Sequence, residues 1–229
     1  MHLYDDSTAE VSGGEIDTNI RAYDQSDVVM TGGVAGVGCC NVENRGSGLI
    51  QIYGGEVGSN VENRGSRLIQ LYGGEVGSNL TTYSGSIEVY GGTIGRNVLS
   101  GWGSTSGTSI YFYGGHIGNF VSNGEDALFH MEGGTLGNFI SGSDTSQPVL
   151  VGLFDLSYGT YGVSDWTDGG QTLSGTLADG SPFNNEVRLE DSATLTLSAP
   201  AQAVPDTGST AALLGMGALA LAFARRKLG

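Results

Sequence analysis

Paired carboxylates are the first residues in this sequence that could do chemistry. Glu56 and Glu75 occupy the same place in two nearly identical segments, and Glu10 and Glu88 share another equivalent position. Two carboxyl groups about 5–9 Å apart would suit hydrolysis of a glycosidic bond. The duplication explains the first pair without catalysis, and the only lysine, Lys227, lies in the C-terminal tail. We therefore predict no catalytic site, with a polysaccharide lyase or glycoside hydrolase as the alternative.

Metal-binding side chains are equally sparse. The Gly-Gly segments, such as GGEVGSN, carry Asn where the calcium-binding nonapeptide repeat carries Asp, and the offset differs. The histidines and the C-terminal aspartates have no ligand spacing; they are His2, His116, His130, Asp165, Asp168, Asp179 and Asp191. A vicinal Cys39-Cys40 pair has no further ligands near it in the sequence. The sequence predicts neither a metal nor a cofactor.

The overall charge excludes a further class of function. The 229 residues contain 24 acidic and 9 basic side chains, which gives a net charge of −15. Such a chain repels the phosphate backbone, so nucleic acid is not an expected partner. Gly is frequent, with 41 residues, but has no three-residue period, which excludes a collagen helix.

The glycines instead mark a longer repeat. Gly-Gly pairs recur every 18 to 23 residues, which is the period of a solenoid. An alternating segment precedes each pair, and period-two alternation indicates a half-buried strand. The predicted inward residues are Ala9/Val11, Val28/Met30, Ile50/Ile52, Ile69/Leu71, Ile87/Val89, Ile110/Phe112 and Phe129/Met131.

Further positions repeat after each Gly-Gly pair. One apolar position contains Ile16, Ala35, Val57, Val76, Ile94, Ile117 and Leu136, and the next contains Ile20, Cys39, Val61, Leu80, Val98, Val121 and Ile140. Cys39 is thereby predicted to be a small core residue. The residues just before this second position are Asn19, Gly38, Asn60, Asn79, Asn97, Phe120 and Phe139. Stacked coils would turn the asparagines into a hydrogen-bonded amide ladder.

These patterns predict an all-β fold, a single-stranded parallel β-helix of about seven 18–23-residue coils. The variable spacing lacks a strict hexapeptide rhythm and so favours a right-handed helix. Residues 41–59 and 60–78 differ at only two positions, as expected from duplication of one whole coil. We expect repeats over residues 1–148, irregular terminal coils and a cap over 149–200, and a separate tail over 201–229.

The tail has three parts in a fixed order. A short motif, Val204-Pro205-Asp206-Thr207-Gly208, precedes an apolar segment over 211–224 and a basic end, Arg225-Arg226-Lys227. A helix of fourteen apolar residues is shorter than the roughly twenty of a stable membrane span. The basic end would stay on the cytoplasmic side. This order predicts a transient membrane anchor that awaits processing.

The segment VPDTGSTAALLGMGALALAFARRK resembles the C-terminal sorting signal of PEP-CTERM-type proteins in its VPDSG/VPDTG variant. The resemblance implies export across the inner membrane of a Gram-negative-type bacterium, recognition by an exosortase-like enzyme, and delivery to the cell surface or an exopolysaccharide matrix. A sortase signal is the runner-up, because VPDTG is one residue from the Leu-Pro-any-Thr-Gly pattern. The first residues, MHLYDDSTAEV, are not those of an export signal. Because the repeat is already running by Ala9, we expect the chain to begin within a longer protein.

A ladder of aromatic and amide side chains is the predicted contact surface. Tyr53, Tyr72, Tyr90 and Tyr113 directly precede Gly-Gly pairs, and Gln51 and Gln70 lie two residues before the first two tyrosines. Such side chains can stack on sugars and hydrogen-bond their hydroxyls. We expect a non-catalytic structural or adhesive surface protein that contacts extracellular polysaccharide. A spacer with no ligand is the other non-catalytic possibility.

Overall fold

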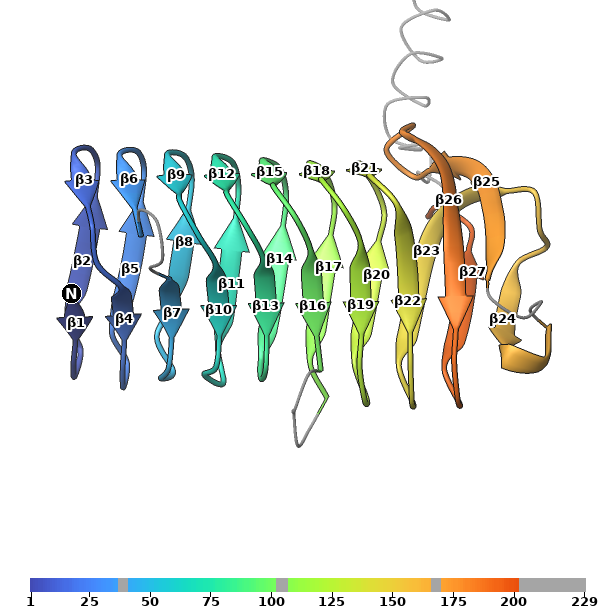
Figure 1. The fold of residues 1–229 in the computed structure, drawn as a ribbon, viewed down its shortest axis with the longest axis horizontal. Coiled ribbons are helices and arrows are strands. Elements are labelled where there is room, and N and C mark those ends of the chain that lie inside the picture. Colours follow the sequence, from blue (N-terminus) through green and yellow to red (C-terminus); the bar gives the residue numbers. More distant parts are fainter. Residues whose placement is uncertain (37–40, 102–106, 166–169, 202–229) are drawn as a thin grey trace, which may run out of the picture.

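The protein is a rod of stacked β-coils (Figure 1). The computed structural model describes residues 1–36, 41–101, 107–165 and 170–201. Each of the first seven coils contributes three short strands, and equivalent strands of successive coils pair in parallel. The third strands form a seven-stranded parallel sheet, so the predicted β-solenoid of about seven turns is confirmed.

The strands form three columns along the rod. Column A comprises β1 (His2–Leu3), β4 (Ile20–Ala22), β7 (Val42–Asn44), β10 (Val61–Asn63), β13 (Leu80–Thr82), β16 (Val98–Ser100), β19 (Val121–Asn123), β22 (Phe139–Gly142) and β26 (Pro182–Leu189). Column B comprises β2 (Thr8–Val11), β5 (Asp27–Met30), β8 (Ile50–Ile52), β11 (Leu68–Leu71), β14 (Ser86–Val89), β17 (Ser109–Phe112), β20 (Leu128–Met131), β23 (Gln147–Phe154) and β27 (Thr194–Ser198). Column C comprises β3 (Glu15–Ile16), β6 (Val34–Ala35), β9 (Glu56–Val57), β12 (Glu75–Val76), β15 (Thr93–Ile94), β18 (His116–Ile117) and β21 (Thr135–Leu136).

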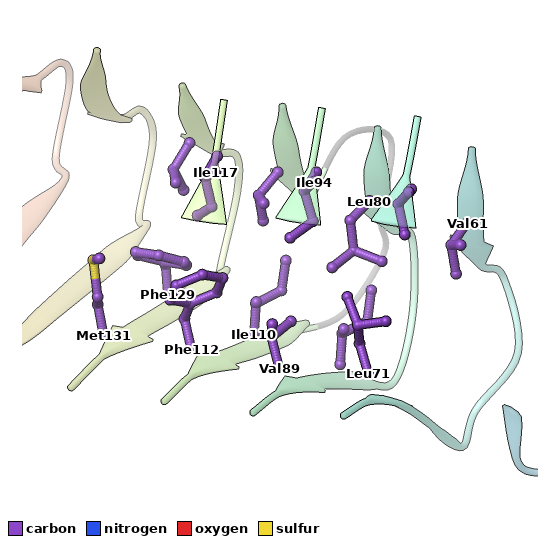
Figure 2. Close-up of a cluster of buried hydrophobic side chains, with 14 of the residues drawn as sticks. Val61, Leu71, Leu80, Val89, Ile94, Ile110, Phe112, Ile117, Phe129 and Met131 are labelled. Atoms are coloured by element: carbon purple, nitrogen blue, oxygen red, sulfur yellow. The ribbon is translucent and has the colours of Figure 1, made fainter. Parts of the chain in front are cut away.

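The interior is filled by the alternating apolar residues of all three columns. Leu71 and Val89 of column B, Leu80 of column A and Ile94 of column C point into the same core (Figure 2). All four are at most 1% exposed. In the first coil, Ile16 stays partly exposed, since only one neighbouring coil of the chain covers it. The inward positions predicted from the alternation are therefore confirmed for the central coils.

From the second repeat onwards, each Gly-Gly pair meets two different constraints of the turn between columns B and C. The second glycine has a positive φ, for example +84° at Gly74, which side chains rarely tolerate. The first glycine lies against the coil below, so that a Cβ on Gly73 would come within 2.9 Å of the Tyr53 carbonyl oxygen. Close stacking of the coils and the left-handed turn together explain the periodic pair.

The register of the second coil corrects two predictions. Val42 pairs with both Ile20 and Val61, and it therefore holds the apolar position that we assigned to Cys39. This coil has extra residues between Ala35 and Val42, and the spacing of the other repeats did not show where they are inserted. Likewise Asn41, whose backbone N–H bonds to Asn19 Oδ1 at 2.6 Å, takes the place assigned to Gly38. Gly38, Cys39 and Cys40 lie outside the described residues.

The amide ladder runs further than the sequence predicted. Asn79 Nδ2 donates to Asn60 Oδ1 at 3.2 Å, and Asn97 Nδ2 donates to Asn79 Oδ1 at 3.0 Å. Asn119 and Asn138 continue the series, each donating to the amide of the coil before. In these two coils the asparagine comes one residue earlier than the pattern requires, and Phe120 and Phe139 form a separate stacked pair.

Parallel stacking continues after the last Gly-Gly repeat. β23 pairs with β20, β26 pairs with β22, and β27 pairs with β23, each in parallel register. Between them, β24 (Gly159–Gly162), a 3-10 turn (Val163–Asp165) and β25 (Gln171–Leu177) form an antiparallel excursion at the end of the rod (Figure 1). The predicted apolar helix over 211–224 lies outside the described residues, and the handedness of the β-helix stays a prediction.

Candidate ligand-binding face

The four predicted ladder tyrosines form one continuous stack. Ring centroids are 4.7 Å apart for Tyr53–Tyr72, 5.0 Å for Tyr72–Tyr90 and 5.1 Å for Tyr90–Tyr113, with interplanar angles of 3°, 7° and 17°. Each backbone N–H bonds to the carbonyl of the coil before, as from Tyr72 to Ile52 at 2.8 Å. In-register stacking of the coils therefore positions the rings one above another.

Stacking limits which parts of the tyrosines can meet a ligand. Both faces of the Tyr72 and Tyr90 rings are covered by neighbouring tyrosine rings, and at one end of the row Tyr113 also lies near-parallel to Tyr111, with ring centroids 6.4 Å apart. Tyr53, Tyr72 and Tyr90 are nevertheless 48%, 37% and 43% exposed. The row thus presents ring edges and phenol hydroxyls to solvent, whereas the sequence had suggested open aromatic faces.

A chain of hydrogen bonds runs beside the tyrosine stack. Gln51 Nε2 donates to Gln70 Oε1 at 2.9 Å, and Gln70 Nε2 donates to Glu88 Oε2 at 2.9 Å. The hydroxyl of Tyr90 donates to the same oxygen at 2.9 Å. We call these residues the tyrosine–glutamine face: Tyr53, Tyr72, Tyr90, Tyr113, Gln51, Gln70 and Glu88. The structure thus places all six residues that the sequence proposed as contacts on one face. Glu88 links the glutamine pair to the tyrosine stack, because it accepts hydrogen bonds from both Gln70 and Tyr90.

Two phenols of this face, Tyr90 and Tyr113, have raised pKa values. The hydrogen bond to Glu88, with burial and the nearby carboxylate charge, raises the pKa of Tyr90 to about 12. Burial raises the pKa of Tyr113, and the charges of Glu88 and Glu132 raise it further. Hydroxyl donors and the one carboxylate, Glu88, therefore define the polarity of the face.

The carboxylate pairs considered for catalysis lie in two different columns, one pair in column C and the other in column B. Glu56 and Glu75 are register partners in column C and are exposed. Glu10 and Glu88 are in column B, on strands that do not pair with each other. His116 contacts Thr135 at 2.8 Å, while His130 lies 2.8 Å from Glu132.

A buried ion-pair cluster was missed by the sequence reasoning. Glu43, only 4% exposed, bonds to Arg45 and, at 3.2 Å, to Arg21, while Glu62 pairs with Arg64 at 2.8 Å. Burial alone would raise the pKa of Glu43, but the bonds and charges of the two arginines hold it below its usual value. The signal was the recurring Glu-Asn-Arg triplet at 43–45 and 62–64, which the duplication had seemed to explain.

Metal ligands do not converge in the described structure. No group of three or more His, Cys, Asp or Glu side chains suited to a metal occurs within residues 1–36, 41–101, 107–165 and 170–201. The same ranges contain no helix with the length and apolar character needed to cross a membrane.

The fold and this face define a β-solenoid rod with a repeated aromatic and amide surface. Its destination comes from the tail, where a family model described as the VPDSG-CTERM motif matches residues 203–228. The match is a PEP-CTERM-type sorting signal, a kind of signal that exosortases process, and it indicates export to the cell surface. Otherwise, no curated protein and no solved structure matches the chain.

The predicted sorting residues all fall inside the matched segment. They are Val204, Pro205, Asp206, Thr207, Gly208, Arg225, Arg226 and Lys227. All of them lie outside the described residues. The recognition of the tail from its three-part order is confirmed by the family model.

Proposed function

We propose that this protein is a non-catalytic rod of the cell surface or extracellular matrix that binds polysaccharide through the tyrosine–glutamine face. The observation that carries the proposal is the row of stacked tyrosines over four successive coils, three of them exposed, bordered by the Gln51–Gln70–Glu88 hydrogen-bond chain. Exposed aromatic patches are typical of interaction surfaces. Because a tyrosine recurs in each of these four coils, the face suits a ligand that repeats along its own length.

The location of the acidic residues supports a binding role over hydrolysis. Glycoside hydrolysis needs one carboxyl group to be a proton donor and another to be ionised. The most buried carboxylate of the ion-pair cluster, Glu43, has a lowered pKa and is neutralised by Arg21 and Arg45, so it is a poor proton donor. The exposed pair in column C, Glu56 and Glu75, has similar surroundings on both members because the coils are duplicated.

The exosortase and the matrix polysaccharide are the proposed partners. Processing within the tail would separate the rod from the apolar segment 211–224, which had held the chain transiently at the inner membrane. The rod would then be displayed with its coils, and hence its tyrosine–glutamine face, accessible to extracellular polymer.

A glycan array run together with turnover assays tests the proposal. We expect binding to at least one polysaccharide and no release of reducing ends or unsaturated products. Tyr72→Ala should reduce the binding, because Tyr72 contacts a ring on either side. Tyr158→Ala is the matched control, since Tyr158 is 50% exposed and lies outside the face. Turnover that is abolished by one carboxylate substitution would support the hydrolase or lyase instead, and silence in both assays would leave a spacer.

A further inference from the structure

The charge around the tyrosine–glutamine face is one-sided. The column B strands from β2 to β20 contain no Lys or Arg, and they contain three acids, Glu10, Asp27 and Glu88. Glu132 directly follows β20. Near β11, the basic residue closest in the sequence is Arg67, which directly precedes the strand. Tyr72 comes five residues later, which is about 16 Å along an extended chain at the usual rise per residue.

The other basic residues of the central coils belong to columns A and C, where Arg96 follows β15 and makes no ion pair among the described residues. Arg21, Arg45 and Arg64 pair with the buried carboxylates of column A. A polysaccharide that carries carboxylate groups would therefore bring like charges to the face and find no basic residue on the column B strands beside the tyrosines. Such a juxtaposition of like charges discriminates against acidic partners.

Glu88 places an acceptor in the middle of the tyrosine row. Both of its hydrogen bonds within the described residues, from Gln70 and from Tyr90, end on Oε2. Its other oxygen, Oε1, makes none in that part of the chain, and the residue is partly exposed. A free carboxylate oxygen beside exposed hydroxyls is suited to an ammonium group or to sugar hydroxyls.

The shape of the row favours hydrogen bonding over face-on stacking. Neighbouring rings cover both faces of Tyr72 and Tyr90, so a sugar meets hydroxyls and ring edges. From Tyr53 to Tyr113 the row is about 15 Å long. Within that length the same donors recur once per coil, which matches a polymer of repeating sugars better than a single small molecule.

On the basis of the proposed function, we infer that the tyrosine–glutamine face binds a polysaccharide with free amino groups and no acidic groups, with an amino sugar seated at Glu88. The ammonium group contacts Glu88 Oε1, and the hydroxyls of the neighbouring sugars bond to the phenols and to the amides of Gln51 and Gln70. A neutral polymer binds in the same register but more weakly, because it lacks the charge pair.

The test compares three oligosaccharide series of matched length by calorimetric titration: glucosamine oligomers, neutral glucose oligomers and galacturonic acid oligomers. We expect affinity to fall in that order and to rise with length until the oligomer spans the row. Glu88→Gln should weaken glucosamine binding about two- to fivefold, the range of an exposed ion pair, and leave glucose binding unchanged.

Matched charge controls separate this site from the general acidity of the chain. Glu125→Gln removes the same charge from an exposed turn outside the face and should alter neither affinity. Equal losses in the Glu88 and Glu125 variants would overturn the inference, because attraction to the net charge of −15 would explain them. Tightest binding of galacturonate would also overturn the inference while leaving the proposed function intact. Absence of binding to every oligosaccharide on the array would refute the proposed function itself.

Discussion

Replacing Ile87 with aspartate should unfold the middle of the rod. Ile87 lies in β14 with its side chain 0% exposed, and it is the register partner of Ile69 and Ile110 in the coils on either side. The surrounding core consists of apolar side chains and contains no basic residue that could pair with a new carboxylate.

The expected cost is close to the stability of a whole domain. Loss of a fully buried isoleucine costs about 1.5–3 kcal/mol of hydrophobic free energy. An unpaired buried charge costs a further 3–5 kcal/mol or so, unless the carboxyl group becomes protonated at its own cost. The sum approaches the roughly 5–15 kcal/mol that separates folded from unfolded domains. Since each coil contacts only its neighbours, the damage should centre on β11, β14 and β17.

Hydrogen exchange measured by mass spectrometry resolves this effect along the chain. Ile87→Asp should lose protection in those three strands before the distal coils, whereas Ile87→Val should cost only about 0.5–1.5 kcal/mol. Ser86→Asp adds the same charge at the neighbouring half-buried position and should leave protection nearly unchanged. A soluble Ile87→Asp rod with normal protection in β11 and β17 would refute the assignment of Ile87 to the core.

Two other predictions concern the ends of the described rod and the tail. Removal of residues 204–229 from an export-competent chain should release the protein into the medium; continued retention at the cell surface would mean that the rod anchors itself. Asp179, in the terminal segment, accepts hydrogen bonds from the backbone N–H groups of Gly134 and Ser181 and from the Ser181 hydroxyl. Burial opposes ionisation, but these bonds hold the pKa of Asp179 below its usual 3.8. The ionised carboxylate therefore contributes to the free energy of unfolding above that pH, and this contribution is lost as the pH falls through the lowered value. Asp179→Ala should therefore cost about 1 kcal/mol at pH 7 and progressively less below pH 3.8 in urea unfolding; a difference independent of pH would contradict this reasoning.

Several parts of the candidate site could be predicted from the repeat alone. Residues at equivalent positions of a solenoid must lie above one another, so the Tyr53–Tyr113 row and the Gln51–Gln70 pair followed directly from their offsets to the Gly-Gly pairs. The role of Glu88 did not follow from those offsets. Whether it bonds to Gln70, to Tyr90 or to solvent depends on side-chain torsions that a position in the repeat does not specify.

What the sequence determined by itself is the coil and its destination. Period-two alternation requires an inward and an outward face, Gly-Gly marks a turn that admits no side chain, and the order of the tail residues identifies a sorting signal. These features are local, so a single chain displays them without any tertiary contact.

Only the tertiary structure decided the register wherever coils differ in length. Backbone hydrogen bonds between coils place Val42, and not Cys39, beside Ile20 and Val61. Side-chain amides reach across one residue to extend the ladder through Asn119 and Asn138. An insertion can be accommodated at any of several turns. Its position depends on which alignment pairs the most backbone groups between neighbouring coils. These hydrogen bonds join different coils, so the sequence of one repeat does not reveal them.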